Sequence, residues 1–300
     1  MISILIPTYN YRIVDLIECL ARQIQISKAY YEILVIEDGS TDQACLAANK
    51  EISNNEGVIY ENLNKNIGRN RIRLLLAQKA KFFNLLFLDA DSRLPDDQFL
   101  QRYEKFLNKF DIVYGGRIYN TRQHVSPEKK LHYLYGKERE EKLITKESPK
   151  GKNFLSCNFL IKKDIFLNLK FDANLTGYGH EDTFMLLQFL KNRNSLTHIT
   201  NPVFHEQLVA EDKFIENQQQ ALHNIEYLYA TYKNDYDFSV VRVISVYKKF
   251  FSFVAGKQLL KILASKHSFL LKKLRSTKNL LVLDMWKLSY FAFLQKANKH

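Results

Sequence analysis

Short apolar runs alternate with helical patterns in the first part of the chain. The apolar runs predict buried strands at residues 2–6, 32–36, 57–60 and 84–88, and the first of them reaches a proline at Pro7. Apolar residues three or four positions apart predict helices at 13–24 and 67–80. Strands that alternate with helices indicate an α/β fold with a mostly parallel sheet flanked by helices.

The pattern changes twice further along the chain. Residues 111–210 are less regular, with predicted strands at 111–114, 154–161 and 197–200, a helix at 183–190 and a charged helical stretch at 128–147. From about residue 211 the spacing is helical to the end, with a single glycine, Gly256, and no proline. We therefore expect an α-helical C-terminal region over 211–300.

The composition removes several classes of protein. A content of 46% hydrophobic and 25% charged residues is that of a globular chain. The three cysteines fit neither a zinc spacing nor a disulfide framework. The N-terminus has no basic region before Pro7, so we do not expect a signal peptide, and no apolar run reaches the ~20 residues of a membrane span. We expect a cytoplasmic protein.

The net charge of +12 is concentrated at one end. Residues 239–300 contain thirteen Lys or Arg and one acid, Asp284, whereas 1–238 contain 31 basic and 31 acidic residues. This shift places a boundary near Asp237. Basic helices with interspersed aromatic residues fit an anionic membrane surface, on the inner face of the cytoplasmic membrane, or a helical cap with solvated lysines. Nucleic-acid binding is the reading that we favour least, and we expect no such partner.

Two acidic motifs follow predicted elements. Asp89 and Asp91 come directly after the fourth strand, where carboxylates two positions apart can bind Mg²⁺ or Mn²⁺ together with substrate phosphates. Glu181 and Asp182 follow two glycines, and a carboxylate there can accept a proton from an attacking hydroxyl. Capping of a helix N-terminus is the structural alternative for both motifs.

Three other features are weaker when taken alone. His205 is a candidate metal ligand, although a single histidine is more often structural. Asp38 ends the second strand and can accept from a base or ribose, or cap a turn. Arg69 and Arg73 share one face at the start of a helix, which suits a phosphate or a solvated basic surface.

In combination these motifs resemble a known family. The ordered series is Pro7-Thr8-Tyr9-Asn10, Glu37-Asp38-Gly39-Ser40-Thr41-Asp42, Asn66-x-Gly68-Arg69 with Arg73, Asp89-x-Asp91, Gly179-His180-Glu181-Asp182 and His205. It is similar to the family 2 glycosyltransferases of the GT-A fold over about residues 1–210, and in particular to bacterial enzymes of the chondroitin-polymerase and β-1,4-galactosyltransferase type. A dinucleotide-dependent oxidoreductase would instead need a Gly-x-Gly-x-x-Gly motif after the first strand.

The resemblance implies a GT-A catalytic domain and a role for each motif. Residues 1–110 would form a nucleotide-binding half and 111–210 an acceptor-binding half. Mn²⁺ or Mg²⁺ would be held by Asp89, Asp91 and His205, with the last two as the expected direct ligands. Asp182 would be the catalytic base, with Glu181 orienting donor or acceptor. The donor would be bound by Pro7, Tyr9, Asp38, Arg69, Arg73, Asp89, Gly116 and Asn158.

The implied activity is inverting, metal-dependent transfer of a sugar from a UDP-sugar of the UDP-Gal, UDP-GalNAc or UDP-GlcNAc class. The acceptor would be a hydroxyl of a saccharide or lipid-linked molecule in cell-surface polysaccharide synthesis. Three departures from the family pattern bear on this expectation: Glu37 replaces an aspartate, Leu74 follows Arg73 in place of asparagine, and Tyr178 replaces a tryptophan. The alternative is a non-catalytic, membrane-associated scaffold that binds nucleotide.

Overall fold

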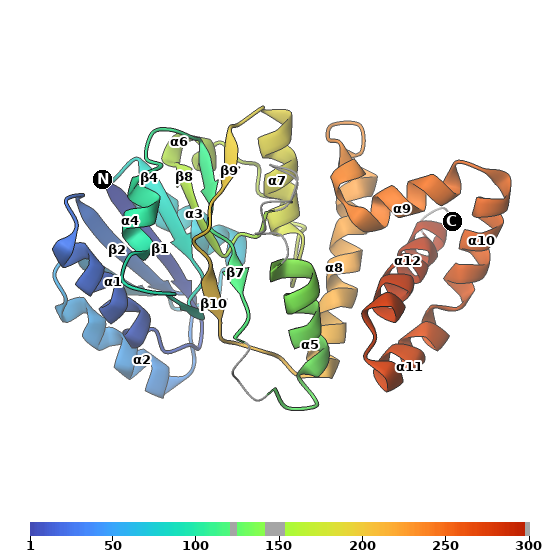
Figure 1. Cartoon of the computed structure of the whole chain (residues 1–300), viewed down its shortest axis with the longest axis horizontal. Coiled ribbons are helices and arrows are strands. Elements are labelled where there is room, and N and C mark those ends of the chain that lie inside the picture. Colours follow the sequence, from blue (N-terminus) through green and yellow to red (C-terminus); the bar gives the residue numbers. More distant parts are fainter. Residues whose placement is uncertain (121–124, 142–153, 298–300) are drawn as a thin grey trace. The chain divides into compact units, whose positions relative to one another are not determined.

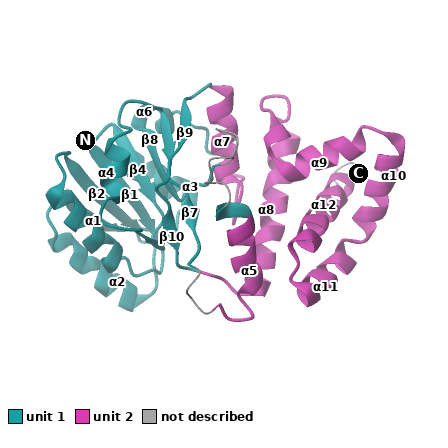
Figure 2. Ribbon diagram, viewed as in Figure 1, with its two compact units in different colours: residues 1–121, 139–171, 193–207 teal, residues 122–138, 172–192, 208–300 magenta. Residues whose placement is uncertain are grey.

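A computed structural model describes residues 1–120, 125–141 and 154–297 of the 300-residue chain. Within it the chain divides into two compact units (Figure 2). Unit 1 comprises Met1–Thr121, Arg139–Phe171 and Arg193–Gln207. Unit 2 comprises Arg122–Glu138, Asp172–Asn192 and Leu208–His300. Segments 122–138 and 172–192, which we assigned to the catalytic region by position in the sequence, thus group with the C-terminal helices.

Unit 1 contains a seven-stranded sheet in the order β3-β2-β1-β4-β8-β6-β9 (Figure 1). All neighbouring strands run parallel except β8, which is antiparallel to β4 and β6. The expected mostly parallel sheet is therefore confirmed. The strands are β1 (Ile2–Thr8), β2 (Tyr31–Glu37), β3 (Val58–Asn62), β4 (Asn84–Leu88), β6 (Ile112–Tyr114), β8 (Asn158–Lys162) and β9 (Leu196–His198).

Pro7 does not end the first strand, because β1 continues to Thr8. The amide of Ile2 points toward β2, so alternation along the strand would direct an amide at position 7 toward β4. The pairing between β1 and β4 already ends at Leu5. The missing N–H of proline therefore costs no ladder hydrogen bond at this position.

Helices cover both faces of this sheet, as amphipathic crossovers require. Ile2, Ile4 and Ile6 belong to one apolar cluster with residues of α1 (Val14–Ile26) and α4 (Phe99–Glu104). On the other side α3 (Arg69–Lys79) contacts β1 and α6 (Lys163–Leu167). Helix α2 (Gln43–Lys50) follows β2 and is capped by the side chain of Asp42.

A smaller three-stranded sheet joins distant segments of unit 1. Its order is β5-β10-β7, with β5 at Ser92–Arg93, β7 at Arg117–Ile118 and β10 at Val203–His205. Strand β10 runs antiparallel to β5 and parallel to β7. The strand register places His205 opposite Ser92, and Ser92 is the residue that follows Asp91 in the sequence.

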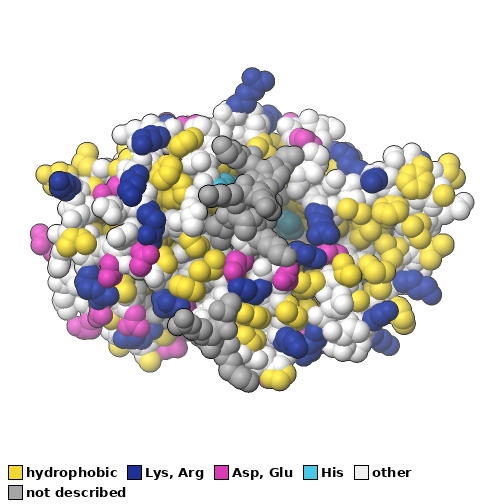
Figure 3. All heavy atoms as spheres, in the orientation of Figure 1, with side chains coloured by type: hydrophobic (Ala, Val, Ile, Leu, Met, Phe, Trp, Pro, Cys, Tyr) yellow, Lys and Arg dark blue, Asp and Glu magenta, His cyan; other side chains and the backbone are white. Residues whose placement is uncertain are grey.

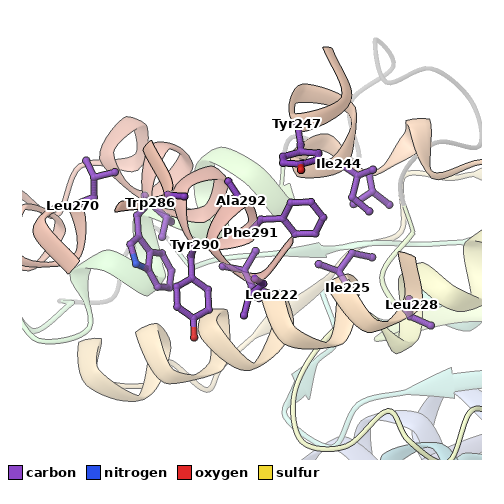
Figure 4. Close-up of a cluster of buried hydrophobic side chains, with 14 of the residues drawn as sticks. Leu222, Ile225, Leu228, Ile244, Tyr247, Leu270, Trp286, Tyr290, Phe291 and Ala292 are labelled. Atoms are coloured by element: carbon purple, nitrogen blue, oxygen red, sulfur yellow. The ribbon is translucent and has the colours of Figure 1, made fainter. Parts of the chain in front are cut away.

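Unit 2 is built from helices, as the spacing after residue 211 predicts. The described helices are α5 (Lys130–Tyr135), α7 (Glu181–Lys191), α8 (Glu211–Tyr232), α9 (Arg242–Phe251), α10 (Val254–Ser265), α11 (His267–Thr277) and α12 (Leu280–Ala297). The core of this unit joins side chains of all these helices, α10 included, and it contains Trp286, Tyr290 and Phe291 (Figure 4). Asp237 caps the turn between α8 and α9, and because both helices belong to unit 2, the charge shift near this residue does not coincide with the boundary between the units.

Within the described ranges, no helix has both the length and the apolar character that crossing a bilayer requires.

Candidate active site

The loop before α3 is fixed to the end of β2 by one carboxylate. Asp38 is buried and accepts hydrogen bonds from the amides of Ile67 at 2.6 Å and Gly68 at 3.0 Å. The loop passes so close to Gly39 that a Cβ there would lie 2.4 Å from the amide nitrogen of Asn66. Asp38, predicted to bind the nucleoside, therefore also positions the start of the helix that carries Arg69.

Two groups of hydrogen bonds, a buried one around Glu37 and an exposed one around Asn10, fix the loops after β1 and β2. Glu37 is fully buried and accepts from Ser40 and, at 2.7 Å, from Asn49. Asn10 accepts from the amides of Thr41 at 2.8 Å and Asp42 at 3.0 Å. The buried group gives Glu37, which replaces the aspartate of the family pattern, a structural use. Next to it, Tyr9 is 51% exposed and Pro7 half-buried, as nucleoside contacts would require.

Two of the three arginines of α3, Arg69 and Arg73, have different environments. Arg73 is 1% exposed and donates from Nη2 to Asp89 Oδ1 at 2.7 Å and to the carbonyl of Ser156 at 2.8 Å. Its Nε and Nη1 have no hydrogen-bond partner among the described residues. Arg69, one turn earlier, is exposed. The structure thus makes Arg73 the partner of Asp89, whereas Arg69 and Arg71 are exposed at the surface.

The small sheet brings Asp91 and His205 together. Asp91 Oδ2 and His205 Nδ1 lie 2.9 Å apart, and the amide of Glu206 donates to the carbonyl of Asp91. Burial alone would raise the pKa of Asp91, but the hydrogen bond and charge of His205, followed by the charges of Arg117 and Arg69, lower it. A carboxylate that stays ionised beside an imidazole is a suitable pair of ligands for a divalent cation.

The predicted metal ligands fall into two groups. Asp91 and His205 form a pair, whereas Asp89 is held by Arg73. Across the described ranges, no cluster of three His, Cys, Asp or Glu side chains is arranged to hold a metal. One carboxylate and one imidazole nevertheless fit Mn²⁺ or Mg²⁺ when the remaining positions are filled by phosphate oxygens and water.

The structure adds residues that the sequence reasoning did not select. Nη2 of Arg117, on β7, lies 2.6 Å from Oε2 of Glu140. The same carboxylate accepts a hydrogen bond from the hydroxyl of Tyr119. The ring of Tyr119 meets that of His205 edge to face at 5.4 Å. Burial and then the charge of Asp91 raise the pKa of Tyr11. The contacts of Arg117 and Tyr119 depend on strand pairing in the small sheet, so no local sequence motif indicates them.

Asn158 has a structural use in addition to the predicted contact with sugar. Its amide nitrogen donates to the carbonyls of Gly116 at 2.8 Å and Asn201 at 2.9 Å, and its oxygen accepts from Tyr103 at 2.7 Å. The side chain is fully buried. Gly116, at φ 82°, is thereby fixed in position. A direct contact between Asn158 and a sugar would require these hydrogen bonds to be exchanged.

In unit 2 the acidic motif begins α7 behind a tightly held loop. Asn224 of α8 donates to the carbonyls of Thr176 at 3.0 Å and Gly179 at 2.9 Å. Gly179 has φ 99°, and a Cβ there would lie 2.7 Å from that of Ala221. Glu181 is buried, and Asp182 Oδ1 accepts from the amide of Thr183 at 2.7 Å. The loop thus fixes where the two carboxylates stand.

His180, at the start of this helix, has an unusual backbone and a shifted pKa. Its φ is 70°, and its Nδ1 lies 2.9 Å from the hydroxyl of Thr183. Burial and, to a lesser extent, the charge of Lys287 lower the pKa of His180 to about 3. The imidazole is therefore neutral at physiological pH.

Comparisons with known proteins agree with this architecture. The family model for glycosyl transferase family 2 matches residues 3–169. A teichoic acid poly(glycerol phosphate) polymerase of Staphylococcus epidermidis is 24% identical over 212 residues, which are 69% of this chain and 28% of that protein. The chain therefore spans less than a third of that relative's length.

Solved structures share the fold at low sequence identity. TarS residues 1–349 of S. aureus superimpose with a TM-score of 0.53 at 16% identity, covering 99% of this chain and 91% of that one. A mannosyltransferase of Pyrobaculum calidifontis in complex with GDP-Man and Mn²⁺ gives a TM-score of 0.57 at 14% identity, covering 97% and 84%. TarS has also been solved with UDP-GlcNAc, and that complex gives a TM-score of 0.50 at 15% identity.

Proposed function

Because the chain belongs to glycosyl transferase family 2, we propose that it transfers a sugar from a UDP-sugar to a hydroxyl of a saccharide or lipid-linked acceptor, with inversion and with a divalent cation. The donor would be of the UDP-Gal, UDP-GalNAc or UDP-GlcNAc class, and the product part of a cell-surface polysaccharide. TarS, which shares the fold, has been solved with UDP-GlcNAc and with UDP.

The observation that carries the proposal is the Asp91–His205 pair with the exposed Arg69 in its electrostatic range. Asp91 and His205 would hold Mn²⁺ or Mg²⁺. When bound, the cation acts as a Lewis acid that stabilises charge on the departing diphosphate. Arg69, at the N-terminus of α3, adds a positive charge and helix amides for the same phosphates.

The other donor contacts divide between direct contact and positioning. Tyr9 would lie against the uracil ring through its exposed face, and Asp38 would accept from the nucleoside while it holds the loop before Arg69. Arg73 would keep Asp89 oriented for the ribose or sugar hydroxyls, because it holds one carboxylate oxygen and leaves the side chain 21% exposed. Gly116 would let the backbone approach the donor.

Asp182 would accept the proton of the acceptor hydroxyl, and Glu181 would orient the substrate. A single base suffices for direct displacement at the anomeric carbon, where the transition state has oxocarbenium character. The product then has inverted configuration. A base of this kind must be held in place to act, and the hydrogen bond from the Thr183 amide to Asp182 supports that requirement.

The test measures release of nucleoside diphosphate from a panel of UDP-sugars, with GDP-mannose as a comparison donor, in Mn²⁺ with and without EDTA. We expect release from a UDP-sugar that EDTA abolishes and that Asp182→Asn lowers by ~100-fold or more. Asp164→Asn is the matched control, because Asp164 also stands in the first turn of a helix and accepts from the next amide, at 2.9 Å.

Metal binding is measured separately from activity. Titration of Mn²⁺ in the presence of UDP should show weaker binding for Asp91→Asn and His205→Gln than for the unaltered protein. Release that persists in Asp182→Asn would move the base to another residue. If no donor is hydrolysed although UDP binds, the chain is a nucleotide-binding scaffold and the enzymatic proposal is wrong.

A further inference from the structure

Helices α10 and α11 carry large apolar side chains on the side turned away from their own core. We define the outer face as the exposed apolar residues of this stretch and the lysines between them. Exposed fractions are 49% for Phe253, 74% for Val254, 59% for Ile262 and 62% for Phe269. Leu259, at 48%, belongs to the same set, and the lysines are Lys257, Lys261, Lys266, Lys272 and Lys273.

Phe253 packs against Phe250, but the other apolar residues of the outer face do not belong to the core of unit 2. Each helix is attached to the core of unit 2 by the opposite side, through Leu260 and Ala264 on α10 and through Leu270 and Leu274 on α11. Exposed Ile and Phe side chains cost solubility unless another surface covers them. On the face drawn in Figure 3, hydrophobic side chains gather over the C-terminal helices with Lys and Arg around them.

The lysines of the outer face are not balanced by acids. Residues 254–277 contain six cations and no Asp or Glu. Arg275 is paired with Asp212, but none of the five lysines has a carboxylate partner among the described residues. On α11 the helical spacing puts Phe269 between Lys272 and Lys273 on one side of the helix. Apolar side chains with flexible cations beside them suit a surface that has an apolar interior and an anionic outer layer.

We propose that this outer face docks on a bilayer that contains anionic phospholipid, with α10 and α11 lying in the plane of the membrane. The apolar side chains would enter the boundary between headgroups and acyl chains, and the lysines would reach up to the phosphates. A second copy of the chain is a poorer occupant because it would bring the same unpaired lysines. A nucleic acid is also poorer, because three of the five apolar residues, Val254, Leu259 and Ile262, offer no ring for stacking on bases.

The test is sedimentation of the full chain with vesicles of phosphatidylcholine alone or with about one third phosphatidylglycerol. We expect binding that requires phosphatidylglycerol. In one variant Lys257, Lys261, Lys272 and Lys273 become Gln, and the partition coefficient should fall by at least ~100-fold, because each basic residue near an anionic surface contributes about fivefold. In the other, Phe253→Ser, Ile262→Gln and Phe269→Gln should lower it by ~10-fold or more.

Matched controls change exposed residues of unit 1. Ile26→Gln and Phe83→Gln remove apolar side chains that are 78% and 50% exposed, and they should leave vesicle binding unchanged. Circular dichroism and light scattering establish that each variant is folded and report its oligomeric state.

Equal binding to both vesicle types, or unaltered binding in the two outer-face variants, would overturn the proposal. A dimer that the apolar variant dissociates without effect on vesicles would assign the face to a second copy. Donor hydrolysis in solution is measured on the same variants, so failure of the docking proposal is separable from failure of the enzymatic one.

Discussion

Arg73 Nη2 lies 2.7 Å from Asp89 Oδ1, and this ion pair joins a fully buried cation to a carboxylate that is 21% exposed. Replacing Arg73 by Met removes the cation and leaves Asp89 and the carbonyl of Ser156 without their donor. Breaking a buried pair costs about 3–5 kcal/mol, and because Asp89 keeps some solvent we expect a loss of roughly 2–3 kcal/mol. Urea denaturation measures the loss.

A double-mutant cycle separates the pair from the packing of Arg73. Asp89→Asn alone leaves the buried guanidinium without its anion and should also destabilise the protein. If the pair is energetically coupled, Arg73→Met with Asp89→Asn will cost less than the sum of the two single changes. Strict additivity would mean that the 2.7 Å contact contributes no coupling energy.

Replacing Asn158 by aspartate is a small chemical change, but we expect it to have a large effect on stability. Asn158→Asp keeps the shape but turns an oxygen toward the carbonyls of Gly116 and Asn201, where the amide donates now. A buried charge facing two acceptors should lower the free energy of unfolding by roughly 3 kcal/mol. Asn64→Asp, at an exposed position, is the control and should change stability little. Equal thermal midpoints for both variants would contradict the structural role.

Two glycines with positive φ allow backbone strain to be separated from close packing. Gly57→Ala places a Cβ 3.9 Å from its nearest neighbour at φ 78°, so it should cost only strain, about 1 kcal/mol. Gly179→Ala has a comparable φ, 99°, but its Cβ would stand 2.7 Å from that of Ala221. We expect Gly179→Ala to cost at least twice as much in urea denaturation, and to lower donor turnover by displacing Glu181 and Asp182.

His180 predicts a pH dependence of stability. The pKa of His180 is about 3 in the folded chain and about 6.5 in the unfolded chain. Between these two pH values the unfolded chain binds a proton at this residue and the folded chain does not. The free energy of unfolding should therefore fall as the pH drops from 6.5 toward 3. Between pH 7.5 and 5.5 the free energy of unfolding should fall by about 1.4 kcal/mol from this group. His180→Asn, which tolerates the same backbone, should flatten this part of the profile.

The sequence was sufficient for the family and the fold because both depend on local signals. Apolar runs gave the strands of the large sheet, and the ordered motifs gave the family, which the family model confirms. Enzyme class follows from the family. The charge shift near Asp237 falls inside unit 2, at a capped turn between two helices, and does not mark the boundary between the two units.

The rest of the site depends on contacts that no local pattern encodes. The resemblance assigned Asp91 and His205 to one metal site, but their 2.9 Å contact is created by pairing of β5 with β10. Arg117 and Tyr119 were not predicted, because they come near the Asp91–His205 pair only when β7 pairs with β10. Conversely, Asn158 was selected for a sugar contact, and its three hydrogen bonds to the framework could not be predicted from its neighbours in sequence.

The small sheet also bears on the order in which the protein folds. It joins strands that are far apart along the chain, so that Arg93 contacts Glu206 across 113 positions. Closing such a loop costs chain entropy that neighbouring strands such as β1 and β2 do not have to overcome. The Asp91–His205 pair should therefore form late, after the large sheet. During synthesis the Asp91–His205 pair can form only after β10 has left the ribosome, so a nascent chain that ends before β10 lacks the site that we propose for the cation.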